Sequence, residues 1–397
     1  MSPTFDPADP AFIADPYPAF ATLRAAAPVH HHPGLGLAVA VTHEAANAVL
    51  RDRSLGRLWT DAAPVEAFAS FNLLHRNSLL ESEPPTHTRL RRLIAAGFGR
   101  GHTERLRPRV DALADDLVAA LAARIADEGS ADLLDLVAAP LPIQVIGELL
   151  GVPAQDRDLL QPWSNAIVKM YEYDLPPAPA LAAETAATEF VAYLRSLIAD
   201  RRTHPSDDLL SDLVAARDGA DRLSEDELVA TAVLVLMAGH EATVNVIGNG
   251  VHALLAHRPQ WELLAHDETL LPTAIEELIR YDAPLQLFER TATAPTTVAG
   301  FPLEPGQKIA ALLGSAAHDP EVFPTPGALD ITRSPNPHLG FGAGIHYCVG
   351  APLARVEVAA TLRALTTRLP DLAPAGTPTR RPEFVIRGFH SLPVTAG

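Results

Sequence analysis

Cys348 is the only cysteine in this 397-residue chain, and it restricts how the chain can be cross-linked. A lone cysteine cannot form an internal disulfide or a multi-cysteine zinc site, so the fold must rest on a packed core. Three glycines, Gly342, Gly344 and Gly350, flank the cysteine. Because glycine has no side chain, the backbone around Cys348 can approach a large flat partner closely. The sulfur is therefore a candidate nucleophile, a candidate thiolate ligand to iron, or a buried bystander.

The residues around Cys348 favour a deprotonated sulfur. His346 precedes it by two positions, and the run from Ala351 to Glu357 has the pattern of a helix start. A thiolate at a helix N-terminus is stabilised by the helix dipole and by free backbone N–H groups. We therefore expect Cys348 to carry chemistry rather than to pack as a small hydrophobic residue.

The composition indicates an acidic protein with an ordinary core. Hydrophobic residues make up 48% of the chain and charged residues 20%, which is usual for soluble globular proteins. The formal net charge of -17 argues against non-specific nucleic-acid binding by the molecule as a whole. The most apolar run, Leu228 to Gly239, is shorter than the roughly 18 residues of a membrane span, and the N-terminus lacks the pattern of a secretory signal. We expect a cytoplasmic protein with no membrane and no nucleic-acid partner.

Apolar periodicity predicts a mainly α protein with small β-sheets early and late in the chain. The predicted helices cover residues 87–99, 105–127, 141–151, 180–202, 224–256, 260–265, 270–282 and 351–368. Extended runs are predicted at residues 37–41, 297–299, 308–312 and 383–387. Ser224 and Glu227 are spaced as a capping box at the start of the long helix 224–256.

The cysteine segment resembles the cysteine-ligand loop of the cytochrome P-450 family. The family pattern is Phe, two residues, Gly, three residues, Cys, one residue, Gly, and these places are taken by Phe341, Gly344, Cys348 and Gly350. The resemblance implies the cytochrome P-450 fold, which is mainly α with small β-sheets and has a long central helix across the haem. It also implies a single domain over residues 1–397, haem b with its iron bound by Cys348, and dioxygen as co-substrate.

The long predicted helix contains the run Ala238-Gly239-His240-Glu241-Ala242-Thr243. Glycine costs about 1 kcal/mol relative to alanine inside a helix, and a buried carboxylate costs more unless it is paired. One interpretation is a helix that kinks where it packs, with Glu241 paired to a buried arginine. The P-450 resemblance implies an oxygen-binding site instead. The family pattern there is Ala-Gly-X-acid-Thr, in which the acid and the threonine manage proton delivery to dioxygen.

This chain departs from that pattern at one position. Ala242 occupies the place of the threonine and Thr243 follows it, but one residue turns about 100° around a helix. The hydroxyl of Thr243 therefore does not simply replace the missing one. The resemblance implies a catalytic group of Glu241, Ala242 and Thr243, and we expect a substrate hydroxyl or a water to complete the proton relay.

Glu277 and Arg280 are three residues apart, a spacing that puts two side chains on one helix face and lets them pair. Most such pairs lie on solvated surfaces, which is one interpretation. The pair also resembles the Glu-X-X-Arg signature of the P-450 family, which a second arginine joins from the loop before the cysteine segment. Arg333 fits that place, so the resemblance implies a structural network that fixes the cysteine loop.

Cationic side chains are expected around an anionic cofactor. His87 and Arg91 are one helical turn apart, and such a basic edge is usually a solvated face. In the P-450 family the corresponding pair binds a haem propionate, and Arg290 and His346 match further propionate contacts. The resemblance therefore assigns all four side chains to cofactor binding.

The resemblance implies a monooxygenase that inserts one oxygen atom into a medium-sized, largely apolar substrate, by hydroxylation or epoxidation in natural-product metabolism. A ferredoxin and its reductase are the expected electron donors, and a monomer is expected. The ferredoxin would dock on a local basic patch of Arg91, Arg92, Arg100 and Arg355. The expected substrate contacts are residues 71–80, 168–173, 235, 238, 285–288 and 389–390.

Three alternatives stay open. A non-catalytic P-450-like partner protein would have the same fold without turnover, although such relatives tend to lose the cysteine. A peroxide-driven oxygenase is favoured by Ala242 in the threonine's place and disfavoured by Glu241. A cysteine-nucleophile hydrolase would use His346 as its base, but it gives the pair of Glu277 and Arg280 no function.

Overall fold

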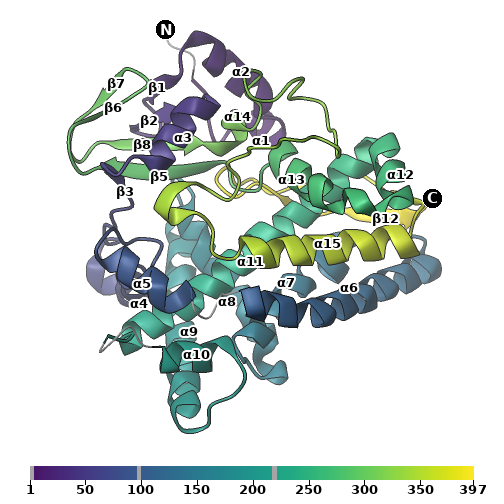
Figure 1. Ribbon diagram of the computed structural model, residues 1–397, viewed down its shortest axis with the longest axis horizontal. Coiled ribbons are helices and arrows are strands. Elements are labelled where there is room, and N and C mark those ends of the chain that lie inside the picture. Colours follow the sequence, from purple (N-terminus) through teal and green to yellow (C-terminus); the bar gives the residue numbers. More distant parts are fainter. Residues whose placement is uncertain (1–3, 96–99, 217–220) are drawn as a thin grey trace.

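Helices form most of the molecule, as Figure 1 shows. The computed structural model describes residues 4–95, 100–216 and 221–397. The α-helices are α1 (Pro10–Ala14), α2 (Tyr17–Ala26), α3 (His43–Arg51), α4 (Ala69–Arg76), α5 (Thr86–Ala95), α6 (Arg100–Glu128), α7 (Pro140–Leu149), α8 (Leu160–Val168), α9 (Pro177–Thr203), α10 (Leu209–Ala215), α11 (Glu225–Ala256), α12 (Arg258–His266), α13 (Leu271–Tyr281), α14 (Leu313–Ala316) and α15 (Ala351–Arg368).

A five-stranded sheet, at the upper left of Figure 1, joins segments that are far apart in the sequence. Its strands, in order across the sheet, are β1 (Val29–His32), β2 (Leu37–Ala40), β8 (Lys308–Leu312), β5 (Leu287–Ala292) and β3 (Leu55–Gly56). Strands β2 and β8 run parallel, with Val39 opposite Ala310, and the other neighbours are antiparallel. The sheet therefore fixes the N-terminal part of the chain against residues 287–312.

Smaller sheets complete the β structure. They are formed by β4 (Ala131–Asp132), β12 (Pro393–Ala396) and β9 (Leu372–Pro374), by β6 (Thr296–Val298) with β7 (Phe301–Leu303), and by β10 (Thr379–Arg380) with β11 (Phe389–Ser391). Strand β12 lies between β4 and β9, so the C-terminal strand is paired on both sides.

The long helix α11 runs through the core. Its predicted capping box is present, because the Ser224 hydroxyl accepts the backbone N–H of Glu227 and the Glu227 carboxylate accepts the backbone N–H of Ser224. By length and composition α11 could cross a membrane, but 78% of its most apolar window is buried inside the protein. It packs against α7, α8, α13 and α15. An apolar, buried helix of this kind forms the core of a large protein.

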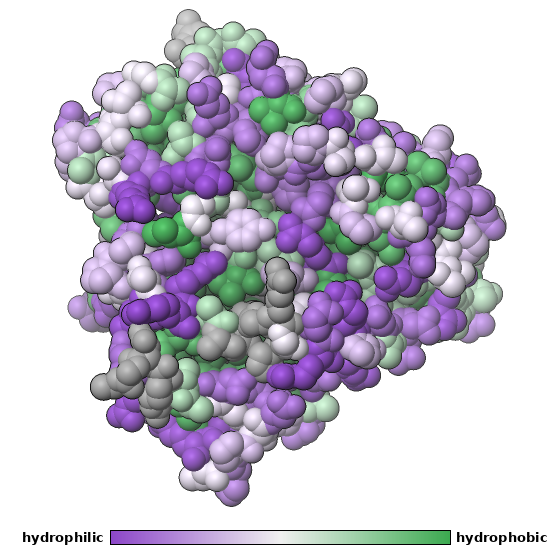
Figure 2. Space-filling view, viewed as in Figure 1, coloured by the Kyte–Doolittle hydropathy of each residue, from purple (hydrophilic) through white to green (hydrophobic). Residues whose placement is uncertain are grey.

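The surface carries few large apolar side chains among the described residues. On the face shown in Figure 2, hydrophilic residues predominate and apolar residues lie in small separate groups. Ile345 and Tyr347, just before Cys348, are each 41% exposed. The cysteine segment therefore brings two apolar side chains to the surface.

The structure confirms the main predicted helices, with shifts of a few residues at their ends. The predicted helix 87–99 corresponds to α5, and residues 96–99 lie outside the described part of the chain. The predictions omitted α1, α3, α4, α8, α10 and α14, which contain 5, 9, 8, 9, 7 and 4 residues. Helices this short show little more than two turns of periodicity.

The prediction of an extended strand at residues 383–387 is wrong. The backbone N–H groups of residues 384–386 donate to the carboxylate of Glu172 at 3.0 to 3.1 Å rather than to a neighbouring strand. An isolated bridge joins Leu285 to Ile386. The strand of this region is β11 (Phe389–Ser391) instead, and a side chain takes the place of the neighbouring strand that the extended run predicts.

Candidate functional site

The cysteine segment has a backbone shape that glycine adopts readily. Gly342 and Gly344 have φ values of 71° and 68°, in the left-handed region. At Gly344 an added Cβ would also lie 2.6 Å from the carbonyl oxygen of Leu50 in α3. The backbone N–H of Cys348 donates to the carbonyl oxygen of Phe341 at 3.0 Å and closes the loop. The shape of the loop therefore requires these glycines.

Cys348 lies just before α15 and is half-buried. Burial raises the pKa of its thiol. The backbone N–H groups of Gly350 and Ala351, and the charges of Arg91 and Arg355, lower that pKa without cancelling the effect of burial. The prediction that the helix start keeps the sulfur deprotonated is therefore wrong for the protein groups alone. A metal ion bound at the sulfur would remove the proton, because metal coordination deprotonates a thiol outright.

The ring of Phe341 forms a cation–π contact with Arg355. The guanidinium carbon of Arg355 lies 4.4 Å from the centroid of the Phe341 ring. Arg355 donates to the carboxylate of Glu276, and His338 Nε2 lies 3.0 Å from Oε2 of the same carboxylate. Burial alone raises the pKa of Glu276, but the hydrogen bonds from Arg355 and His338 outweigh it and lower that pKa to about 2. Arg355 therefore helps to order the cysteine segment.

The other arginines of the predicted docking patch differ in their surroundings. Arg91 Nη1 donates to the carbonyl oxygen of Ile345 at 3.3 Å. Arg92 has an interaction of its own within the protein, and the side chain of Arg100 lies outside what the structure describes. The patch therefore stays a prediction.

One face of α11 is accessible to solvent although most of the helix is buried. Leu234, Ala238 and Ala242 are spaced four residues apart, which puts them on one face of the helix, and each is exposed or half-buried. Glu241 and Thr243 are only 3% and 2% exposed. The structure thus puts Ala242 on the accessible face and Thr243 off it, in keeping with the rotation per residue of a helix.

Gly239 and Glu241 each cost folding free energy inside a buried helix, and the contacts of both residues account for their presence in α11. Gly239 packs against α7, where an added Cβ would lie 2.7 Å from Ile146 Cδ1. Glu241 Oε2 accepts a hydrogen bond from Arg381 Nη1 at 3.0 Å. This pairing with an arginine is what the first interpretation of the helix predicts.

The structure gathers the four predicted cationic side chains. The rings of His87 and His346 lie 4.6 Å apart at an interplanar angle of 62°. Burial, and then the charges of His346 and Arg91, lower the pKa of His87 to about 4. Burial, and then the charge of Arg57, lower the pKa of Arg290 to about 10. Burial, and then the charge of Arg290, lower the pKa of His346, and the hydrogen bond with Glu83 offsets only part of this.

Two members of this cationic cluster lack the partners that buried polar groups normally have. His87 Nε2 is buried without a hydrogen-bond partner. Arg290 is 3% exposed. Its guanidinium donates to the carbonyl oxygen of Glu289, and no described carboxylate lies within ion-pair distance. Buried cations are normally paired, so the cluster fits a ligand that brings carboxylates. Together with the thiol of Cys348, it fits a haem with its two propionates and its iron.

Acidic residues that the sequence analysis did not assign lie beside this cluster. Glu83 Oε1 lies 2.8 Å from His346 Nε2 and also accepts the backbone N–H of Arg57 at 2.8 Å. Arg57 forms a fork with Glu81. Local sequence gives no signal for these pairs, because the partners come from separate segments.

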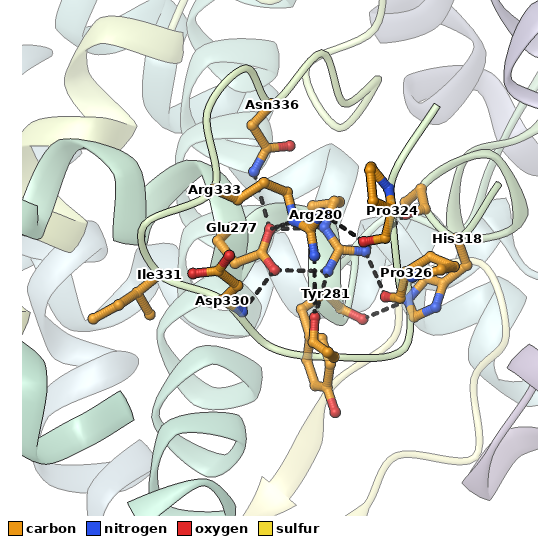
Figure 3. A network of polar contacts seen from close by, with 12 residues as sticks. Glu277, Arg280, Tyr281, His318, Pro324, Pro326, Asp330, Ile331, Arg333 and Asn336 are labelled. Atoms are coloured by element: carbon orange, nitrogen blue, oxygen red, sulfur yellow. Dashed lines mark hydrogen bonds and ion pairs between the residues drawn. The ribbon is translucent and has the colours of Figure 1, made fainter. Parts of the chain in front are cut away.

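Glu277 is the centre of a buried polar network, drawn in Figure 3. Glu277 and Arg280 have fully buried side chains and share two hydrogen bonds of 2.7 Å. Arg333 Nε and Asn336 Nδ2 each donate to Glu277 Oε2 at 3.0 Å, and the backbone N–H of Asp330 donates to Oε1 at 3.0 Å. This confirms the predicted contact of the two arginines with the glutamate. The interpretation of an exposed surface pair is wrong.

Comparisons with known proteins agree with this architecture. A family model described as Cytochrome P450 matches residues 37–369. The cytochrome P450 monooxygenase PikC of Streptomyces venezuelae is 42% identical over 96% of this chain and 91% of its own length. The 6-deoxyerythronolide B hydroxylase of Saccharopolyspora erythraea is 41% identical over 79% of this chain and 76% of its own length. The crystal structure of P450BioI with an acyl carrier protein ligated to hexadec-9Z-enoic acid covers 98% of this chain and 99% of that chain, with a TM-score of 0.91 and 32% identity.

Fold, cysteine loop and buried network together define a haem monooxygenase that uses dioxygen. The chain belongs to the cytochrome P450 family. Its similarity to monooxygenases over nearly its whole length makes it an enzyme of that kind and speaks against the alternatives of a non-catalytic partner and a hydrolase.

Proposed function

We propose that this protein binds haem b with the iron at Cys348 and oxidises a medium-sized, largely apolar natural product. Residues 1–397 act as a single domain in this proposal. The observation that carries it is a half-buried cysteine beside a cluster in which two buried groups, His87 Nε2 and the guanidinium of Arg290, have no carboxylate partner among the described residues. A sulfur donor suits the iron of a haem, and the two buried groups suit its propionates.

The residues around the loop have distinct roles in this proposal. The side chains of His87, Arg91, Arg290 and His346 bind the propionates. Phe341, Gly344 and Gly350 shape the loop, so that the backbone approaches the face of the macrocycle closely. When bound, the haem supplies oxygen activation, in which two electrons and two protons convert dioxygen into one substrate oxygen and one water.

Proton supply rests on α11. Ala242 presents no hydroxyl on the accessible face, so a substrate hydroxyl or a water takes the place of the threonine side chain. Glu241 exchanges the protons, and the buried Thr243 supports the helix beside it. The protein's contribution is thus position and proton transfer, while the cofactor carries the oxidation.

The accessible face of α11 supports the substrate class. Leu234, Ala238 and Ala242 present a small and apolar surface, which suits a largely apolar molecule. A relative that hydroxylates 6-deoxyerythronolide B supports an oxygen-bearing natural product of medium size. Hydroxylation or epoxidation is the expected outcome.

Electrons come from a ferredoxin and its reductase in this proposal. The exposed side chains of Ile345 and Tyr347 and the partly accessible Arg91 lie beside Cys348, so a small acidic protein that docks there would come close to the sulfur. An apolar centre with a cationic edge suits such a partner. The enzyme would act as a cytoplasmic monomer.

The absorption spectrum of the reduced protein with carbon monoxide tests the proposal. We expect a strongly red-shifted Soret band in the wild type and its loss in C348S, with unchanged far-ultraviolet circular dichroism. An unshifted band, or protein that takes up no haem, would overturn the proposal. Turnover with hydrogen peroxide but without redox partners would mean that peroxide replaces dioxygen and the two electrons from the ferredoxin, and it would overturn that part.

A further inference from the structure

Glu241 and Arg381 form an ion pair that joins α11 to the C-terminal segment. Arg381 Nη1 lies 3.0 Å from Glu241 Oε2, and the side chains are 20% and 5% exposed. The backbone N–H of Arg381 donates to the carbonyl oxygen of Gly388 at 3.1 Å, which fixes the base of the side chain. The pair therefore joins a partly solvated guanidinium to a buried carboxylate.

Only one of the two carboxylate oxygens of Glu241 accepts a hydrogen bond from a described residue. Glu241 Oε1 is buried and has no hydrogen-bond partner among the described residues. It lies 3.8 Å from Nδ1 of His240, whose two ring nitrogens are also buried without partners. Burial lowers the pKa of His240, which keeps the ring neutral. Glu241 thus has one oxygen held by a hydrogen bond and one buried oxygen without a hydrogen-bond partner among the described residues.

The ion pair of Arg380 with Asp282, next to Arg381 in the sequence, differs from this arrangement. Arg380 Nη2 donates to Asp282 Oδ2 at 2.8 Å, while Arg387 Nε and the hydroxyl of Tyr17 donate to Oδ1 at 2.7 and 2.8 Å. Both oxygens of Asp282 are therefore satisfied. A buried oxygen without a hydrogen-bond partner costs about 1–3 kcal/mol of folding free energy. Stability alone therefore does not explain why Oε1 of Glu241 is left without a partner among the described residues.

We propose that Arg381 is a positioning residue for proton delivery by Glu241. It holds Oε2 and fixes the orientation of the buried carboxylate, so that Oε1 alone exchanges protons with a water or a substrate hydroxyl next to Ala242. Arg381 itself does not give up a proton, because a guanidinium stays charged in proteins. This inference rests on the proposed function and adds to it a residue from outside α11.

The variants R381M, R381K and E241Q test the inference. The matched control is R380M, which removes the ion pair of Arg380 with Asp282 and leaves Glu241 and Arg381 unchanged. The probe is dioxygen reduction by the holoenzyme with a surrogate ferredoxin and its reductase. We expect R381M to lower the rate about tenfold, a part of what general acid–base catalysis contributes, and to change the H2O/D2O rate ratio. R381K should recover much of the rate, because an ammonium can still pair with Oε2. E241Q should show the same defect as R381M.

A second readout does not depend on turnover. Within ion-pair reach of Glu241, the described charged or titratable groups are Arg381 and His240. A buried carboxylate without its cation tends to bind a proton, so difference infrared spectra at neutral pH should show a protonated carboxyl band in R381M. The band should be absent from R380M and from the double variant R381M/E241Q.

The outcomes separate the two proposals. Wild-type rate and isotope ratio in R381M, with no new carboxyl band, would overturn the role of Arg381 while the thiolate spectrum still supports the enzyme class. A defect in R380M as large as in R381M would also overturn it, because the effect would then be general loss of structure. A wild type without the red-shifted carbon monoxide band would remove the proposed function itself.

Discussion

Replacing Glu277 by glutamine tests whether the buried network fixes the cysteine loop. The amide keeps the size of the side chain, so the variant creates no cavity. It removes the negative charge that faces Arg280 and Arg333, and it puts an NH2 group where donors already point. Since Oε1 and Oε2 together accept five hydrogen bonds, an amide with a single acceptor oxygen cannot keep them all.

The expected cost follows from the burial of the pair. Glu277 and Arg280 have no exposed side-chain surface, and removing one partner of a buried ion pair costs about 3–5 kcal/mol. Arg280 keeps hydrogen bonds to three backbone carbonyl groups, of Ala317, Pro326 and Ala328, which places the cost at the lower end. Even about 3 kcal/mol is a large part of the 5–15 kcal/mol that stabilises a typical domain.

Urea unfolding followed by far-ultraviolet circular dichroism measures this cost. The control is E262Q, which removes the exposed pair of Glu262 with Arg258, whose side chains are 54% and 37% exposed. An exposed pair one helical turn apart is worth only about 0.3–0.5 kcal/mol. Hydrogen exchange should also rise in residues 324–336 of E277Q, because the anchor of that loop is lost. A loss below about 1 kcal/mol, or unchanged exchange in the loop, would refute the reasoning.

Two further predictions concern the cysteine segment. In G344A the new methyl group would clash with the backbone of α3, and we expect loss of haem uptake; G342A, whose nearest neighbour would be 3.6 Å away, should retain haem at the cost of about 1 kcal/mol of backbone strain. Equal haem content in the two variants would contradict the argument from the close contact. The lowered pKa of Glu276, about 2 against an ordinary 4.5, means that its ion pairs stabilise the fold above pH 4.5 and that this stability is lost as the pH falls toward 2. The difference in unfolding free energy between wild type and E276Q should therefore shrink over that window, and a difference independent of pH would refute this.

The parts that the sequence predicts well are those in which chemistry and spacing lie in one segment. Gly342 and Gly344 have positive φ in the loop before Cys348, and the sequence of residues 341–350 already supplies a glycine at each of these turns. The capping box of α11 likewise needs only Ser224 and Glu227. Local patterns of this kind survive folding, because tertiary contacts do not compete with them.

The parts that the sequence does not reveal depend on partners far along the chain. The pKa of Cys348 rises because the folded chain buries the sulfur, an effect that no helix-start pattern contains. Glu83 pairs with His346 across the cationic cluster. Residues 384–386 are a short run of apolar residues that is typical of a buried strand, yet Glu172 accepts their N–H groups. Such a run indicates that the side chains are buried, but it does not identify the acceptor of the backbone N–H groups.

The C-terminal segment is the clearest case, because it links two regions that the sequence treats as unrelated. Its Arg381 reaches Glu241 on α11, and its residues 384–386 are held by Glu172 in the connection between α8 and α9. A shift of that connection would therefore pull on the same short segment that positions the carboxylate. Ala242 lacks the hydroxyl that the family pattern places beside this carboxylate, so in the proposed function the orientation of Glu241 carries more of the proton delivery. The departure at Ala242 is thus best understood together with Arg381, which is 140 residues from Glu241 in the sequence.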